Sequence, residues 1–99
     1  MLLGSQNITQ GDVRRYMVSY DEFLIKGAVL TAVTVAVSAG ATSSVGSGAT
    51  AAVLTVDEKG IIFWVTGGSL NEKFTLSIQV TDNFSETVHD TINFTVVAP

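Results

Sequence analysis

The clearest pattern in the chain is a regular alternation over residues 74–81. An apolar side chain stands at every second position from Phe74 to Val80, and Thr, Ser and Gln occupy the positions between. A period of two is typical of a half-buried strand. An apolar run without alternation, residues 61–65, precedes it and contains the only tryptophan, Trp64. We predict that the two runs form a hairpin, with residues 61–65 buried on both sides or lying at a packed edge.

Two more strands are predicted in the first half of the chain. Residues 12–20 place Tyr16, Val18 and Tyr20 on one face, with polar residues and a methionine on the other. Residues 29–38 alternate valine and threonine with leucine, alanine and serine. Side chains branched at Cβ favour a strand over a helix, so both segments are expected to join a sheet.

The connections and the remaining strands are less regular. A single helical turn is expected over residues 21–24, and residues 40–48 form a Gly/Ser-rich connection that we expect to be flexible and unanchored. Residues 51–56 predict a short strand, and residues 86–97 alternate again. Asp90 falls on the apolar side of this last strand near its beginning, where we expect it to remain in water.

These segments amount to six or seven strands spaced about 8–14 residues apart, with no helical pattern longer than one turn. This spacing predicts an all-β, two-sheet antiparallel sandwich, with a small barrel as the alternative. Parallel βαβ architecture is excluded because it needs crossover helices. We assign residues 12–99 to the sandwich domain and residues 1–11, with Leu2, Leu3 and Ile8, to an N-terminal arm or short first strand.

Charge is unusually sparse for a soluble domain. Charged residues make up 14% of the 99-residue chain, and the mean hydropathy is +0.43. Residues 27–56 contain no charged residue. The apolar part of that stretch, residues 28–37, is half the roughly 20 residues that a membrane-spanning helix requires. We therefore interpret the uncharged stretch as a surface that packs against other subunits.

The charge balance and the residue inventory exclude several functions. A net charge of −4, with five Lys and Arg, is poor for neutralising the phosphates of a nucleic acid. The chain has no cysteine, and its single histidine, His89, stands on a polar strand face without a partner. Asp82, Glu86 and Asp90 would form a metal site only if the turn folded back on itself. We predict no catalytic, cofactor-binding or metal-binding residues.

The glycines and aromatic residues have structural explanations, with two exceptions. Gly67 and Gly68 are expected in a turn that needs positive φ, because no helix follows to complete a phosphate site. Most aromatic side chains fall on the apolar faces of their strands. Trp64 is out of phase with its neighbour, and Phe84 lies in a turn, so we predict that both contact a partner protein. Leu2, Leu3 and Ile8 of the arm are predicted to do the same.

The order of features resembles a known family. An Asp-x-x-x-Tyr start leads into a Tyr-Asp-x-Phe-Leu step, a Lys-Gly and a Val/Thr strand. An aromatic-Val-Thr-Gly-Gly tract, a Phe-Thr-Leu-Ser-Ile-Gln-Val-Thr-Asp strand and a Thr/Val-rich final strand complete the pattern. It is similar to the small Ig-like virion proteins of tailed bacteriophages described as fiber–tail adaptor proteins, over about residues 12–97. The residues that carry the resemblance are Tyr20, Asp21, Phe23, Leu24, Gly27, Val65, Thr66, Gly67, Gly68, Phe74, Val80, Thr81 and Asp82.

One position departs from the family, which usually has a Trp where this chain has Val35. The resemblance implies an Ig-like sandwich without catalytic residues, assembled in several copies in the virion, within the cytoplasm of the bacterial host. Its implied partners are tail, neck, fiber or capsid proteins and further copies of itself, with no nucleic acid and no membrane. A capsid decoration protein is the close alternative, and a carbohydrate-binding surface module is a third.

Overall fold

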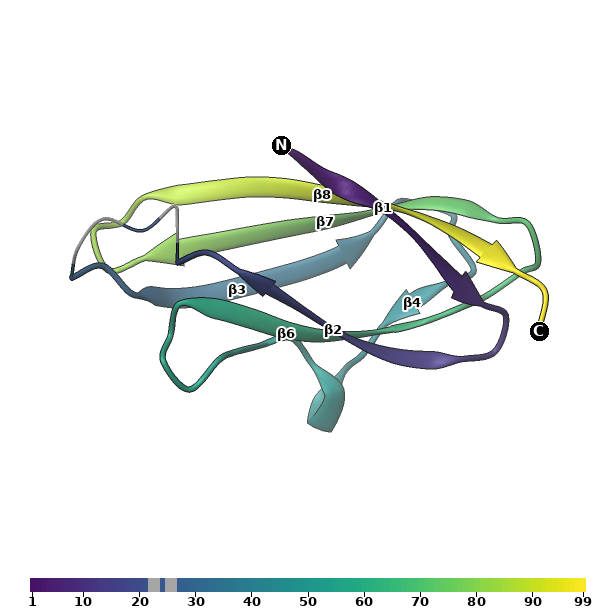
Figure 1. Cartoon of the computed structure of the whole chain (residues 1–99), viewed down its shortest axis with the longest axis horizontal. Helices are drawn as coiled ribbons and strands as arrows, with labels where there is room; N and C mark the ends of the chain where they lie inside the picture. Colours follow the sequence, from purple (N-terminus) through teal and green to yellow (C-terminus); the bar gives the residue numbers. More distant parts are fainter. Residues whose placement is uncertain (22–23, 25–26) are drawn as a thin grey trace.

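Two sheets face one another across a layer of apolar side chains in the computed structural model, which describes residues 1–21, 24 and 27–99 (Figure 1). The first sheet has the strand order β1 (Leu2–Thr9), β8 (Thr87–Val97), β7 (Lys73–Asp82) and β3 (Leu30–Val37). In the second, β6 (Gly60–Thr66) lies between β2 (Val13–Ser19) and the two short strands β4 (Ser44–Val45) and β5 (Val53–Leu54), with a 3₁₀ turn, η1 (Gly48–Thr50), between them. The predicted all-β sandwich is confirmed.

The pairing of the strands is Ig-like. The β2–β6–β4 order corresponds to strands B, E and D of that fold, and β3–β7–β8 to strands C, F and G. β1 pairs with β8 in parallel, from Leu2 opposite Thr91 to Thr9 opposite Val97. Ile8 of β1 is 2% exposed and belongs to the core. The sequence predicted either an arm or a short first strand for this segment. Residues 2–9 form a strand of the first sheet.

The predicted hairpin of residues 61–65 and 74–80 is wrong. β6 and β7 lie in different sheets, joined by residues 67–72, which cross from one layer to the other. Each is a central strand whose two edges are already occupied, so neither has an edge for the other. Only one face of β6 is buried. Phe63 points into the core, whereas Trp64 is half-buried on the outer face, which corrects the prediction of burial on both sides.

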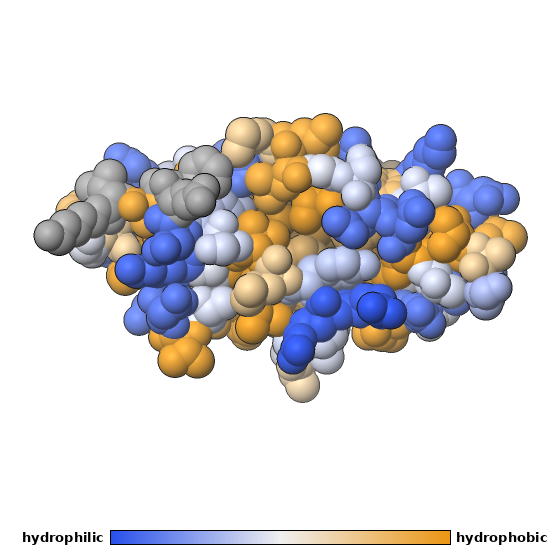
Figure 2. All heavy atoms as spheres, viewed as in Figure 1, coloured by the Kyte–Doolittle hydropathy of each residue, from blue (hydrophilic) through white to orange (hydrophobic). Residues whose placement is uncertain are grey.

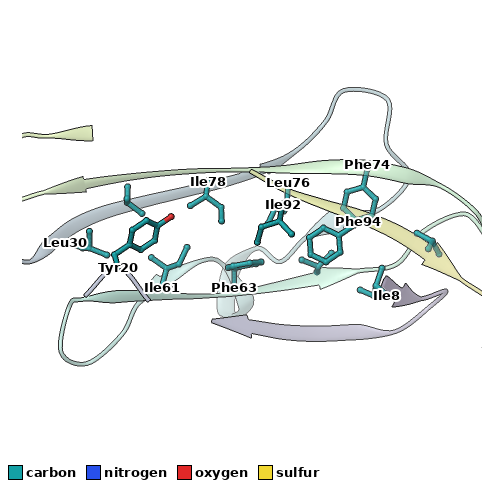
Figure 3. Packing of buried hydrophobic residues seen from close by; sticks show 13 residues of the cluster. Ile8, Tyr20, Leu30, Ile61, Phe63, Phe74, Leu76, Ile78, Ile92 and Phe94 are labelled. Carbon is teal, nitrogen blue, oxygen red and sulfur yellow. The ribbon is translucent and has the colours of Figure 1, made fainter. Parts of the chain in front are cut away.

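The core is built from large side chains of both sheets (Figure 3). Phe74 and Phe94, on adjacent strands of the first sheet, stack with ring centroids 5.1 Å apart. Tyr16 of the second sheet contacts Phe94 edge-on at 5.4 Å and stacks on Phe63 at 5.8 Å. These aromatic contacts join the two layers and add to the apolar area that holds them together.

The connection over residues 40–48 is anchored, which corrects the prediction of a free linker. The carboxylate of Glu72 accepts hydrogen bonds from the backbone N–H groups of Thr42 and Ser43, each 2.9 Å long. It also accepts one from each of their hydroxyl groups, at 2.7 Å. The segment is thereby fixed beside the 67–72 connection, and Ser44 and Val45 can pair with β6.

Two glycines in the 67–72 connection are required for space and not for their φ angles. Neither Gly67 nor Gly68 has positive φ, so the predicted reason is wrong. A Cβ atom on Gly68 would lie 2.5 Å from the backbone nitrogen of Ser43, and one on Gly67 would lie 2.6 Å from the carbonyl oxygen of Thr9. Residues 67 and 68 pass so close to the backbone of Thr9 and of Ser43 that only glycine fits at these two positions.

Two further strand predictions need correction. A bulge between Leu30 and Ala32 shifts the phase of β3, so Leu30 joins the buried side although it was predicted on the opposite face from the valines. Asp90, predicted to stay in water, is 1% exposed and accepts a hydrogen bond from the hydroxyl group of Tyr20. The helical turn expected over residues 21–24 includes residues outside the described part of the chain; Leu24 packs against the core.

Candidate interaction surface

The outer face of the second sheet carries a row of apolar side chains. Met17 of β2 and Val53 of β5 flank Ile62 of β6 in the strand register. The side chains of Met17 and Val53 are 68% and 47% exposed, and Ile62 is half-buried between them. Alternation explains the row, because the residues next to Ile62 in the chain, Ile61 and Phe63, point into the core.

Trp64 extends this row along β6. Arg15 stands directly opposite Trp64 on β2, and Val13, 59% exposed, stands opposite Thr66. Cross-strand neighbours on one face of a sheet lie close enough for their side chains to pack together. We call Val13, Met17, Val53, Ile62 and Trp64 the outer apolar patch. The patch places Trp64 at the surface, as its phase predicted.

A groove borders this patch where β1 and β2 diverge. It is lined by Leu3 and Gln6 of β1, Tyr16 and Val18 of β2, and Ile92, and Met17 belongs to both the groove and the patch. Figure 2, viewed from the side on which β1 and β2 diverge, shows apolar side chains gathered over the middle of the molecule. Leu3 is half-buried and lines the groove, Leu2 is 55% exposed but is not part of the groove lining, and Ile8 is enclosed in the core.

Phe84 lies apart from the patch. It is 55% exposed in the turn between β7 and β8, where Oδ1 of Asp82 accepts hydrogen bonds from the backbone N–H groups of Phe84 and Glu86, each 2.9 Å long. This turn lies beside the start of β3, because the backbone N–H of Val29 donates to Asn83. The structure therefore does not bring Phe84 together with Trp64.

The side chains that could take part in catalysis or bind a metal ion lie apart from one another in the described residues. His89 is exposed on the outer face of the first sheet, and no three His, Asp or Glu side chains among residues 1–21, 24 and 27–99 form a cluster that could hold a metal ion. The carboxylate of Asp82 is engaged by its own turn, and that of Asp90 by Tyr20. No described helix is long and apolar enough to span a membrane.

The hydrogen-bonded acids and phenols serve the fold. The four hydrogen bonds to Glu72 lower the pKa of its carboxyl to about 2. Burial, together with the hydrogen bond to Asp90, raises the pKa of Tyr20 well above its ordinary value. Burial also raises the pKa of Tyr16, against the opposing effect of Arg14. The shifts of Glu72 and Tyr20 stabilise the protonation state in which each is hydrogen-bonded to a second segment, and Tyr16 lines the groove as a neutral phenol.

Sequence reasoning found part of this surface. The phase of Trp64 against Phe63 and the outward phase of Met17 both identified surface positions. Val53 was missed, because two residues of strand are too short to show a period. Ile62 was missed because the run around it is apolar throughout. Comparison with known proteins adds no relative: no known family matches the chain, and no curated protein is significantly similar to it.

Proposed function

We propose that this protein is a non-enzymatic structural component of a tailed bacteriophage particle, a multi-copy adaptor that docks tail fiber or neck components to the tail. The observation that carries the proposal is the outer apolar patch with Trp64 at its surface. The resemblance to the Ig-like adaptor proteins supplies the biological setting.

The mechanism is burial of the patch and the adjoining groove against another virion protein. Removing apolar side chains from water contributes about 25 cal/mol per Å² of buried area. Tryptophan and methionine are enriched where protein interfaces are most tightly packed, and charged residues are depleted there. Arg15 beside Trp64 supplies a polar rim that orients the partner.

The first test measures copy number. Quantitative mass spectrometry of purified particles should give roughly six to a few tens of copies relative to the portal protein, as closed rings at a tail or neck would require. Hundreds of copies would instead support capsid decoration. Absence from particles would overturn both assignments and favour the carbohydrate-binding module.

The second test addresses the patch itself. Met17→Glu places a charge on an exposed position of the patch and should prevent incorporation into particles without unfolding the chain. Gln79→Glu adds the same charge on the exposed outer face of the opposite sheet and serves as the matched control. Equal incorporation of both variants would show that the patch is not the docking surface.

A further inference from the structure

β3 is an edge strand without the features that usually protect an edge. It pairs with β7 on one side, and in the described part of the chain no strand pairs with its other side. The short strands β4 and β5 lie near β3 but hydrogen-bond to β6 in the second sheet. Over its eight residues β3 has no charge, proline or glycine, and its bulge stands at the very start. Such edges are templates for pairing with another strand.

The side chains along β3 show that the core is open at this edge. Val33, Val35 and Val37 face inward but are only half-buried. Their neighbours on β7 (Leu76, Ile78 and Val80) are at most 2% exposed. The difference arises because, among the residues that the structure describes, no strand of the same sheet lies beyond β3. A further strand at this edge would complete their burial.

The hydrogen-bond pattern identifies which backbone groups are available. The N–H of Ser38 donates to the carbonyl of Thr75 on β7, at 2.9 Å. In an antiparallel ladder the direction alternates from residue to residue. Ala36 and Thr34 therefore also point toward β7, and the backbone groups of the three half-buried valines point away from it. These groups form a regular row along the free edge.

This row is complementary to itself. In an antiparallel pair with Val35 on a two-fold axis, Val35 lies opposite Val35 of the second copy and Val33 lies opposite Val37. Each opposed pair exchanges two hydrogen bonds, giving about six in all. On the outer face Thr34 lies opposite Ala36, so small uncharged side chains meet across the junction.

The distribution of charge favours the same antiparallel arrangement. β3 begins at an acidic end, where Leu30 binds the carbonyl of Glu58 and pairs with Asp82. The carboxylates gathered at this end in the described residues are Asp21, Asp57, Glu58, Asp82 and Glu86, and Lys59 is paired with Asp21. At the other end of β3, Ser38 donates to Thr75, two residues after Lys73, and the nearby carboxylate, that of Glu72, is occupied by Thr42 and Ser43. Antiparallel pairing keeps the acidic ends of the two copies at opposite ends of the junction, whereas parallel pairing would place them side by side.

We propose that two copies of this chain associate through β3, antiparallel and two-fold symmetric about Val35, so that their first sheets become one continuous sheet. This pairing is a β-strand addition in which the partner is a second copy. The inference does not depend on the role in a virion, since it rests on the edge alone.

The absence of cysteine makes the register directly testable. Across such a pair the Cα atoms of two residues at position 35 lie about 5.5 Å apart, within the range of a disulfide. Val35→Cys in the full chain should form a covalent dimer on mild oxidation. Val37→Cys is the control, because the two residues at position 37 would lie about 14 Å apart along the strands. Crosslinking of Val37→Cys as readily as Val35→Cys would overturn the register.

A second measurement does not rely on an inward-facing residue. Sedimentation equilibrium of the full chain should show a monomer–dimer equilibrium, which Thr34→Lys with Ala36→Lys should weaken at least about tenfold by placing like charges opposite one another. His89→Lys with Thr91→Lys adds the same charge two strands away and should leave the equilibrium unchanged. A wild-type chain that remains monomeric at millimolar concentration, or a dimer equally weakened by both pairs, would overturn the proposal.

Discussion

The hydroxyl group of Tyr20 donates a 2.8 Å hydrogen bond to Oδ2 of Asp90 inside the sandwich. Tyr20 follows β2 of the second sheet and Asp90 belongs to β8 of the first, so this bond crosses the core between the layers. Both residues are 1% exposed. Oδ1 of Asp90 lies 3.4 Å from the α-amino nitrogen of Met1. Oδ1 accepts no hydrogen bond from the described residues, so the positive charge of the Met1 amino group is what offsets the burial of this oxygen.

Tyr20→Phe should destabilise the protein by about 2 kcal/mol, since it leaves a buried carboxylate without its hydrogen-bond donor. Chemical denaturation at neutral pH measures the change. Combining it with Asp90→Ala, which removes the acceptor, gives a double-mutant cycle in which the coupling between the two residues is read directly. A loss of similar size when Ala replaces Asp90 beforehand would show that the bond contributes little.

The same contact predicts a loss of stability in base. Burial and Asp90 raise the pKa of Tyr20 above the ordinary 10.0, so the neutral phenol is the form that the folded state favours. Its contribution is complete below about pH 10 and is lost as the pH rises further, when the unfolded chain releases the proton more readily. The free energy of unfolding should fall more steeply above pH 10 for the wild type than for Tyr20→Phe. Parallel curves would contradict this.

The lowered pKa of Glu72 predicts a loss of stability in acid. Its pKa is lowered from 4.5 to about 2 by hydrogen bonds from Thr42 and Ser43. Its contribution is therefore complete above about pH 4.5 and is lost as the pH falls toward 2. Glu72→Gln should be less stable than the wild type at pH 7, with the difference shrinking between pH 4.5 and 2. A constant difference across that range would show that the carboxylate charge is not responsible.

Ile8→Ala should cost about 3 kcal/mol, the usual range for removing most of a buried aliphatic side chain. Its neighbour Asn7 is exposed on the same strand, so Asn7→Ala is the control and should change stability by less than about 0.5 kcal/mol. Thermal unfolding compares them. If both variants matched the wild type, β1 would contribute no packing to the fold.

Gly68→Ala should cost about 2 kcal/mol, because the new methyl group would meet the backbone of residues 42 and 43 and force the loops apart. At Gly40 a Cβ atom would meet nothing within 4 Å, although φ is +81°. Gly40→Ala therefore separates the cost of backbone strain from the cost of crowding. Amide exchange should show faster opening of Ser44 and Val45 in Gly68→Ala alone, and equal opening in both variants would contradict the crowding explanation.

The sequence by itself determined the class of fold and most strand positions. Alternation in residues 74–80 and the inward phase of Tyr16, Val18 and Tyr20 were sufficient, because a period of two follows from strand geometry. The same periodicity placed Trp64 on the opposite face from Phe63. The alternation of side chains is a local property of a strand, and it does not depend on which strand lies beside it.

Only the tertiary structure decided which strands pair and which polar groups are buried. β6 and β7 are consecutive and both apolar, yet one edge of β6 is taken by β2 and one edge of β7 by β3, both distant in sequence, and their other edges by nearer strands, so they lie in different sheets. From the sequence alone Asp90 is predicted to be exposed, and only the structure places Tyr20 beside it as a donor. Residues 40–48 are likewise predicted to be a free linker, and only the structure shows that Glu72 anchors them. Tyr20 lies 70 residues from Asp90, and Glu72 lies 30 and 29 residues from Thr42 and Ser43, and no local pattern encodes a contact over such a separation.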